Sequence, residues 1–315
     1  MAVFVRSISG VLIILVMIGL GYILSRRGWF DEQSRRLIAR LVTQIALPAY
    51  MISTITTQFS AQTLKSTLPD LRFPIVSMLI MFGLSVIAFH GFKIHPERRG
   101  LFEAMFANSN TVFVGLPVNE ALFGPKSMPF VLVYYMANTT FFWTLGAYLI
   151  QRDGQGTATF NLVTTLKKIF SPPLLGFMLG VVLVLLDIQL PTWIMKDFSY
   201  IGGLTVPLSM IFIGTAIAGA GVQNIRLNRD SLGILFGRFL VAPTLMACLV
   251  IPTPMPVLMK QVFILQAAMP VMTNAPVVAK LYHADTDYAA IMVTETTLLS
   301  LVVIPILMVI VQQIH

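Results

Sequence analysis

Charged residues are scarce in this chain. Only 11% of its 315 residues are Asp, Glu, Lys or Arg, whereas 57% are hydrophobic. Soluble domains carry about 25% charged residues, so this composition excludes an ordinary soluble protein. A helix that crosses the ~30 Å hydrocarbon core of a bilayer needs about 20 apolar residues, and the chain has many such stretches. The sequence therefore predicts an all-α polytopic membrane protein that lies in a lipid bilayer.

Cysteine is almost absent as well. Cys248 stands alone in the sequence, which excludes an internal disulfide and a multi-cysteine metal site. It lies in an apolar run, so we expect it to be a small core residue. The sequence has no residues at the spacing of a metal-binding motif. It also has no Ser/His or Asp/Asp pair at the same depth in the membrane, as an intramembrane protease requires. We expect neither an enzyme nor a bound cofactor.

Ten apolar stretches are separated by short breaks that carry charge, glycine or proline. We expect ten membrane-spanning helices, at residues 5–24, 37–55, 73–92, 100–121, 127–150, 168–188, 196–218, 230–251, 258–281 and 287–312. The fourth and ninth are the least hydrophobic, which favours helices buried inside the protein rather than helices facing lipid.

The lysines and arginines are divided unequally between the two sides of this arrangement. Fourteen fall in one set of loops and six in the other. Cytoplasmic loops of membrane proteins are enriched in these residues, so the first set is predicted to be cytoplasmic and both termini to be outside. The net charge of +8 is explained by this orientation, and we expect no nucleic-acid partner. The predicted location is the inner (plasma) membrane of the cell.

The chain divides into two halves of five spans each. The first half is residues 1–151, a short polar linker covers 152–167, and the second half is residues 168–315. Because each half has an odd number of spans, the two halves are inserted upside down relative to each other. This predicts two inverted five-helix repeats.

One apolar stretch in each half is interrupted by asparagine and proline. The first interruption contains Asn110, Thr111, Gly115 and Pro117, and the second contains Pro270, Thr273, Asn274 and Pro276. A shift of 159 residues places Pro117 on Pro276. Paired broken helices in corresponding positions are the best sequence-level indication of a secondary transporter's binding site.

These segments resemble the auxin efflux carrier family, which includes plant PIN carriers and bacterial permeases linked to malate and malonate. The resemblance covers nearly the whole chain. It depends on Asn110-Thr111-x-x-x-Gly115-x-Pro117 in the fourth span, on Ala46-Leu47-Pro48 in the second, and on Gln266-Ala-Ala-Met-Pro270 followed by Pro276-Val-Val-Ala-Lys280-x-Tyr282 in the ninth.

The resemblance implies that helices 4 and 9 are broken and cross at their prolines. It implies a scaffold from helices 1, 2, 6 and 7, a transport domain from helices 3–5 and 8–10, and an elevator-like motion that carries an organic anion. Plant PIN carriers have a long central loop, whereas the linker at 152–167 is short. A small carboxylate such as malate or malonate is therefore expected rather than auxin. The resemblance leaves a homodimer open.

Proline removes a backbone donor and clashes with the preceding turn, so backbone groups are expected to be free near the prolines of both interruptions. The ends of half-helices then present partial positive charge to an anion, and Asn and Thr side chains add neutral donors. Simple helix kinks and helix–helix hydrogen bonds are the alternative, and the pairing of the two interruptions favours binding. The predicted substrate-binding residues are Asn110, Thr111, Gly115, Pro117, Pro270, Thr273, Asn274, Pro276, Pro48 and Asn138, with Gln44, Thr139 and Thr140 as secondary candidates.

Arg238 and Glu295 are the charged residues deepest in apolar sequence. Charges within a membrane are costly, face inward and tend to pair. Three interpretations remain open: an ion pair that holds helix 8 to helix 10, an arginine that reaches outward, or a carboxylate that couples transport to H⁺ or Na⁺ with Arg238 as its neighbour.

Two functions remain open at this point. The favoured one is a secondary active transporter of small organic anions with alternating access. The alternative is a passive channel or facilitator for the same anions, which could use the same broken helices.

Overall fold

The computed structural model describes residues 2–155, 162–220 and 228–314, and these residues are helical apart from short connections. Residues 156–161 of the predicted linker, and Arg226, lie outside this part of the chain. The helices are α1 (Ala2–Arg26), α2 (Glu32–Leu41), α3 (Leu47–Gln58), α4 (Ala61–Thr67), α5 (Arg72–Phe92), α6 (Arg99–Ala107), α7 (Leu116–Phe123), α8 (Met128–Phe141), α9 (Ala147–Gln155), α10 (Leu162–Ile169), α11 (Pro172–Leu185), α12 (Thr192–Gly203), α13 (Thr205–Ala220), α14 (Arg229–Phe236), α15 (Ala242–Val250), α16 (Val257–Ala267), α17 (Ala275–Tyr282) and α18 (Thr286–Val311).

Several helices join end to end into stretches long and apolar enough to cross a membrane. Five such stretches occur among the described residues, at Glu32–Gln58, Ala61–Phe92, Thr192–Gly219, Arg229–Val250 and Thr286–Val311. Shorter apolar helices cover Leu12–Arg26, Thr111–Phe123, Pro172–Leu185 and Val257–Ala267. The all-helical architecture of a polytopic membrane protein is therefore present.

Large apolar side chains cover much of the outer surface. Val16 on α1, Ile87 on α5 and Tyr200 on α12 are each more than two-thirds exposed. Exposed apolar patches of this extent mark a surface that another apolar phase covers, and for spanning helices that phase is lipid. Cys248 is also exposed, so the expectation of a core position was wrong. In a membrane protein an apolar run does not reveal which of its faces is internal, because both lipid and core accept apolar groups.

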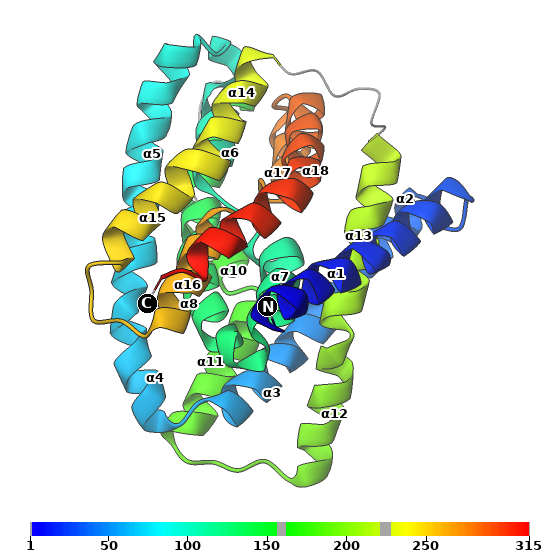
Figure 1. Ribbon diagram of the computed structural model, residues 1–315. Helices are drawn as coiled ribbons and strands as arrows, with labels where there is room; N and C mark the ends of the chain where they lie inside the picture. Colours follow the sequence, from blue (N-terminus) through cyan, green and yellow to red (C-terminus); the bar gives the residue numbers. More distant parts are fainter. Residues whose placement is uncertain (1, 156–161, 221–227, 315) are drawn as a thin grey trace.

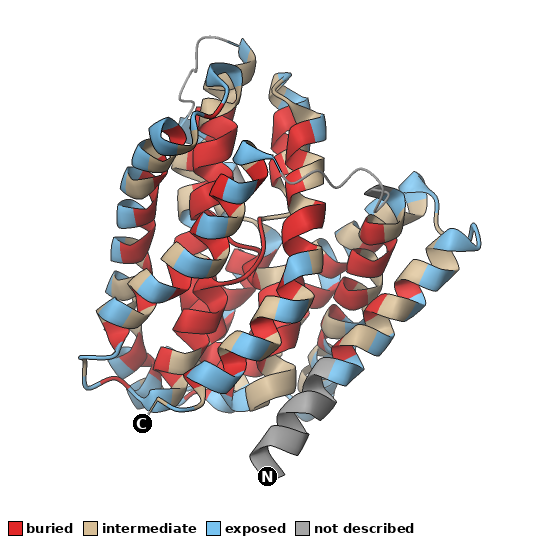
Figure 2. Ribbon diagram, turned by 45° about the horizontal axis from the view of Figure 1, so that its top comes forward, coloured by how far each residue is buried: buried red, intermediate tan, exposed pale blue. Residues whose placement is uncertain are grey.

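The helices associate in two groups (Figure 1). In one group α1 lies along α13, and α3 packs on α11 and α12. In the other group α5, α6, α8, α9 and α14–α18 enclose the largest cluster of buried apolar residues. Figure 2 shows buried residues where helices face one another and exposed residues around the outside. The two groups meet through α7 and α18, which contact α1 and α13.

Small residues set the closest approach inside the first group. The backbone of α1 at Gly21 lies against that of α13 at Ile211, and Gly214 lies against Ile18 in return. A β-carbon at either glycine would overlap a main-chain carbonyl oxygen. Small residues at such contacts allow helices in membranes to pack closely.

Helices α6 and α16 form the centre of the second group. Eight of the nine residues of Arg99–Ala107 and eight of the eleven residues of Val257–Ala267 are buried. The expectation that the fourth and ninth apolar segments are internal is confirmed for these two helices. Helix α6 ends at Ala107 and α16 ends at Ala267, and both ends lie at the candidate site.

Candidate functional site

Two interruptions of helical structure meet at the centre of the second group. The first separates α6 from the helix that resumes at Thr111, and the second separates α16 from α17. Ser109 and Val271 form an antiparallel bridge between them, and the Asn110 N–H donates to the Pro270 carbonyl at 2.8 Å. Segments 160 residues apart in sequence are therefore joined backbone to backbone.

Side chains from neighbouring helices satisfy further backbone groups of these interruptions. The Asn138 amide of α8 pairs with Ser109 in both directions: its Oδ1 accepts from the Ser109 N–H at 2.9 Å and its Nδ2 donates to the Ser109 carbonyl at 2.8 Å. The Thr296 hydroxyl of α18 accepts from the Val271 N–H at 3.1 Å. Unpaired backbone groups cost several kcal/mol each in a membrane, so these contacts stabilise both interruptions.

Arg238 is completely buried beside the same crossing. Its Nε and Nη2 donate to the Met269 carbonyl at 3.1 and 3.0 Å, and Nη2 also donates to the carbonyl of Ala267. Its Nη1 donates to the carbonyls of Phe106 and Ala107 at 3.2 and 2.9 Å. The guanidinium thus binds the carboxyl ends of both α6 and α16. These five hydrogen bonds to main-chain carbonyls hold Arg238 at the crossing, and its pairing with Glu295 stays a prediction.

Four widened helical turns of the π type occur in the described residues, and all four contribute to this region. They are Val42–Ala46 (η1), Thr111–Gly115 (η4), Phe142–Gly146 (η6) and Gly237–Val241 (η8). Three of them end two residues before a proline, namely Pro48, Pro117 and Pro243. A proline ring clashes with the carbonyl four residues earlier, and widening the helix by one residue relieves that clash. In η4 the result is a Gly115 N–H that donates five residues back, to Asn110.

A cavity of about 220 Å³ opens on one side of the crossing. It lies where the helix resuming at Thr111 and helix α17 both begin. Its lining comes from both helix groups and consists of Thr43, Gln44, Leu47, Ser109, Asn110, Thr111, Val112, Phe113, Tyr135, Thr139, Trp143, Ser171, Pro172, Pro173, Met272, Thr273 and Asn274.

Asn110 is the most distinctive residue of this lining. Its Oδ1 accepts from the Phe113 N–H at 3.1 Å and caps the start of the helix, while its Nδ2 has no hydrogen-bond partner among the described residues. The side chain is 2% exposed. The hydroxyls of Ser109 and Thr139 also make no hydrogen bond of good geometry to any described residue. The Tyr134 hydroxyl lies near that of Ser109, and the Tyr135 hydroxyl lies near that of Thr139. Buried donors without partners are uncommon, and they point to a ligand or water in the cavity.

The structure brings only some of the predicted site residues to the cavity. Asn110, Thr111, Thr273 and Asn274 line it, and so do the secondary candidates Gln44 and Thr139. The other predicted residues do not line it; they are Pro48, Gly115, Pro117, Asn138, Pro270, Pro276 and Thr140. Pro48 and Pro117 follow widened turns that do line it, Gly115 packs on Gln266, and Asn138 and Pro270 hold the crossing together. Pro48 and Pro117 thus shape the cavity without lining it.

Sequence reasoning missed Thr43, Ser109, Tyr135, Trp143 and Ser171. The sequence does contain a signal for Thr43. A proline inside a spanning helix predicts a distorted turn four or five residues earlier, and Thr43 lies five residues before Pro48. No comparable signal marks Trp143 or Ser171, which reach the cavity only because α8, η6 and α11 pack beside the crossing.

Glu295 lies on α18 and is 4% exposed. The next residue, Thr296, holds the second interruption through Val271. Glu295 therefore lies within one residue of a contact that stabilises the crossing, although it is not part of the cavity lining.

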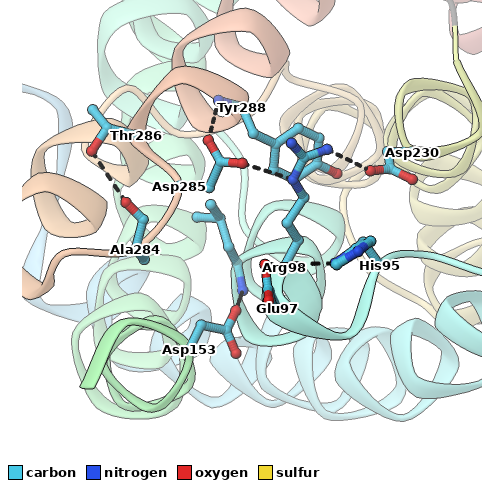
Figure 3. A network of polar contacts seen from close by, with 10 residues as sticks. His95, Glu97, Arg98, Asp153, Asp230, Ala284, Asp285, Thr286 and Tyr288 are labelled. Carbon is cyan, nitrogen blue, oxygen red and sulfur yellow. Dashed lines mark hydrogen bonds and ion pairs between the residues drawn. The ribbon is translucent and has the colours of Figure 1, made fainter. Parts of the chain in front are cut away.

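A second polar cluster joins the helix starts at one end of the molecule (Figure 3). Arg98 donates to Asp285 at 2.7 Å and to Asp230 at 3.0 Å, and its guanidinium lies 4.8 Å from the centre of the Tyr288 ring. Asp153 accepts from the Leu101 N–H at the start of α6. Burial raises the pKa of the Asp153 carboxyl, against the opposing effect of this N–H. The cluster holds α6, α9, α14 and α18 together, so it supports the crossing from one end.

Comparisons with known proteins agree with this architecture. A family model described as membrane transport protein matches residues 7–308. An uncharacterized transporter of Methanothermobacter thermautotrophicus is 29% identical over 96% of this chain and 98% of its own length. An uncharacterized transporter of Methanocaldococcus jannaschii is 26% identical over 93% of this chain and 95% of its own. The uncharacterized transporter YfdV of Escherichia coli K12 is 24% identical over 67% of this chain and 68% of its own.

Proposed function

Because the chain belongs to the membrane transport protein family, whose members are transporters rather than enzymes, we propose that it is a secondary active transporter of small organic anions. This family is the one that the motifs of the second, fourth and ninth segments indicate, so the family resemblance is confirmed. The substrates we propose are carboxylates such as malate or malonate.

One observation carries the proposal of an anionic substrate. Asn110 lines the cavity at the beginning of two helices, and its Nδ2 donor has no hydrogen-bond partner among the described residues. Each helix start presents unsatisfied N–H groups and roughly half a positive charge, which favours a bound anion. Asn274 is the residue before α17, and its side chain makes no capping bond to that helix. Its amide remains available to a ligand in the same cavity.

The size of the cavity supports a small substrate. Drug-sized ligands occupy pockets of about 300–1,000 Å³, whereas this cavity has about 220 Å³. Its lining is partly apolar, with Leu47, Val112 and Phe113 beside the polar groups. A short carbon chain that ends in one or two carboxylates fits this mixture.

The position of the cavity supports alternating access by an elevator-like motion. Thr43, Gln44 and Ser171 come from the helices predicted to form the scaffold, and the crossing comes from those predicted to form the transport domain. A site at this boundary changes its exposure when one group slides along the other. The backbone bridge between the two interruptions also supports two inverted repeats of five spans, divided at the linker 152–167, with helices 4 and 9 crossed.

Reconstituted protein tests the proposal directly. Purified protein in liposomes is expected to take up labelled malonate or malate against a concentration gradient when an H⁺ or Na⁺ gradient is imposed. A thermal-shift screen with di- and monocarboxylates identifies the preferred anion first. Uptake that only equilibrates the anion across the membrane, with or without an ion gradient, would identify a passive channel or facilitator. Failure to bind or move any organic anion would refute the proposal.

The orientation in the membrane is a separate prediction. The fourteen-to-six distribution of cations, with ten expected spans, predicts that both termini lie outside the cytoplasm, and we propose that the membrane is the plasma membrane. A reporter that is active only in the cytoplasm should remain silent when it is fused to the C-terminus. A reporter fused at the linker 152–167 serves as the positive control. A strong signal from a C-terminal fusion that still transports substrate would contradict the orientation.

Glu295 is the residue that we propose to couple transport to H⁺ or Na⁺. It is a buried carboxyl on a helix that also holds the crossing, so its protonation can affect that contact. Glu295→Gln keeps the shape but cannot ionise. The variant should fold and exchange substrate, yet lose at least about tenfold in gradient-driven accumulation. Thr297→Ala, at the residue that follows Thr296 on the same helix, is the matched control. Equal accumulation by the Gln variant and the wild type would assign Glu295 a structural role.

A further inference from the structure

Four helix ends meet at the crossing, and their partial charges oppose one another. The helices that begin at Thr111 and Ala275 present positive ends to the cavity, whereas α6 and α16 end there, and the carbonyls at their ends carry partial negative charge. Each end corresponds to roughly half an elementary charge, so the four ends together nearly cancel. A crossing of this kind does not by itself favour an anion.

Arg238 breaks this balance. Its five hydrogen bonds all go to main-chain carbonyls at or beyond the ends of α6 and α16. The positive charge is therefore placed on the two negative helix ends and offsets them. Arg238 needs no carboxylate partner for this role, because the carbonyls of both helix ends together act as its counter-charge.

The path from Arg238 to the cavity is short. The guanidinium holds Met269, the next residue Pro270 accepts from the Asn110 N–H, and Asn110 lines the cavity. In the first interruption, the Arg238 guanidinium donates to the carbonyl of Ala107, which lies two residues before the cavity residue Ser109. The side chain comes from a widened turn, η8, and is completely buried.

We propose that Arg238 is a positioning residue that determines the sign of the charge that the cavity accepts. By neutralising the carboxyl ends of α6 and α16, it leaves the helix starts at Thr111 and Ala275 as the uncompensated charges, so the cavity attracts anions. The proposal rests on the proposed function for the identity of the site. It adds that a residue outside the cavity lining sets its charge preference.

The test measures the potential in the cavity without using a substrate. Thr273→Cys places a thiol on the lining, in a background with Cys248→Ser. The rates of its modification by a negatively and a positively charged methanethiosulfonate reagent are compared. With Arg238 present, the anionic reagent should be favoured. In Arg238→Gln the ratio of the anionic rate to the cationic rate should fall by about tenfold, because loss of the buried charge disfavours the anionic reagent and favours the cationic one. Arg238→Lys should retain the ratio, because it keeps the charge.

Gln33→Cys on the exposed surface of α2 is the control position, where the ratio should not change.

The outcomes separate this proposal from the proposed function. An unchanged ratio in a folded Arg238→Gln variant would overturn the role of Arg238, whichever substrate the protein carries. A changed ratio in a protein that binds no carboxylate would support the role of Arg238 and refute the proposed function. If Arg238→Gln does not fold, Arg238→Met supplies a second neutral variant. Loss of folding in both, with a folded Arg238→Lys that keeps the ratio, would show that the crossing requires a positive charge here and would support the proposal.

Discussion

Replacement of Asn110 by aspartate is expected to abolish binding of the transported anion while the protein stays folded. The new carboxylate keeps the oxygen that caps the Phe113 N–H, and a negative group at a helix start is favourable. The same carboxylate replaces the unpaired amide donor of a residue that lines the cavity with a group of the anion's own charge. Juxtaposed like charges cost several kcal/mol, so affinity should fall by more than about a hundredfold.

Two further variants distinguish the donor from the cap. Asn274→Ala removes an amide that makes no capping bond, so binding should weaken by about tenfold at an unchanged melting temperature. Asn228 caps α14 through the Ser231 N–H at 2.8 Å and lies outside the cavity. Asn228→Ala should therefore lower stability by about 1 kcal/mol and leave binding intact. The measurements are anion affinity by calorimetry and melting temperature in detergent. Normal affinity in both Asn110→Asp and Asn274→Ala would place the site elsewhere.

Gly21→Ala is expected to damage the packing of α1 on α13. The added methyl group would overlap the carbonyl oxygen of Ile211, and the obstacle is rigid backbone rather than the end of a flexible side chain. Overpacking of this kind costs about 1–3 kcal/mol, which is a large part of a typical protein's stability. The variant should melt at a clearly lower temperature and yield less monodisperse protein.

Gly19→Ala is the matched control on the same helix. No atom lies within 4 Å of the position that its β-carbon would occupy. Alanine also favours the helix over glycine by about 1 kcal/mol, so this variant should be as stable as the wild type or slightly more stable. Equal loss of stability in both variants would show that α1 does not depend on close approach at Gly21.

Several of the features on which these predictions depend could be derived from sequence alone. The scarcity of charge and the length of the apolar runs determine an all-helical membrane protein, because an apolar run of about 20 residues pairs its own backbone groups in lipid when it is a helix. Asn110, Thr111, Thr273 and Asn274 were also recognisable, because polar residues beside proline in an apolar stretch are costly without a purpose. The motifs around Pro48, Pro117 and Pro270 determined the family.

The tertiary structure decided what each of these residues does. Asn138, which the sequence predicts to bind substrate, holds the backbone of Ser109 and does not line the cavity. Arg238, which the sequence predicts to be a neighbour of Glu295, binds carbonyls of two helix ends. Both sets of contacts have one physical cause. Breaking a helix in an apolar medium frees backbone groups, and which side chain satisfies them depends on three-dimensional neighbours more than 25 residues away in the chain. Local sequence determines where the helices break, whereas only the packing of the helices determines how the freed groups are paired and which donors remain for a ligand.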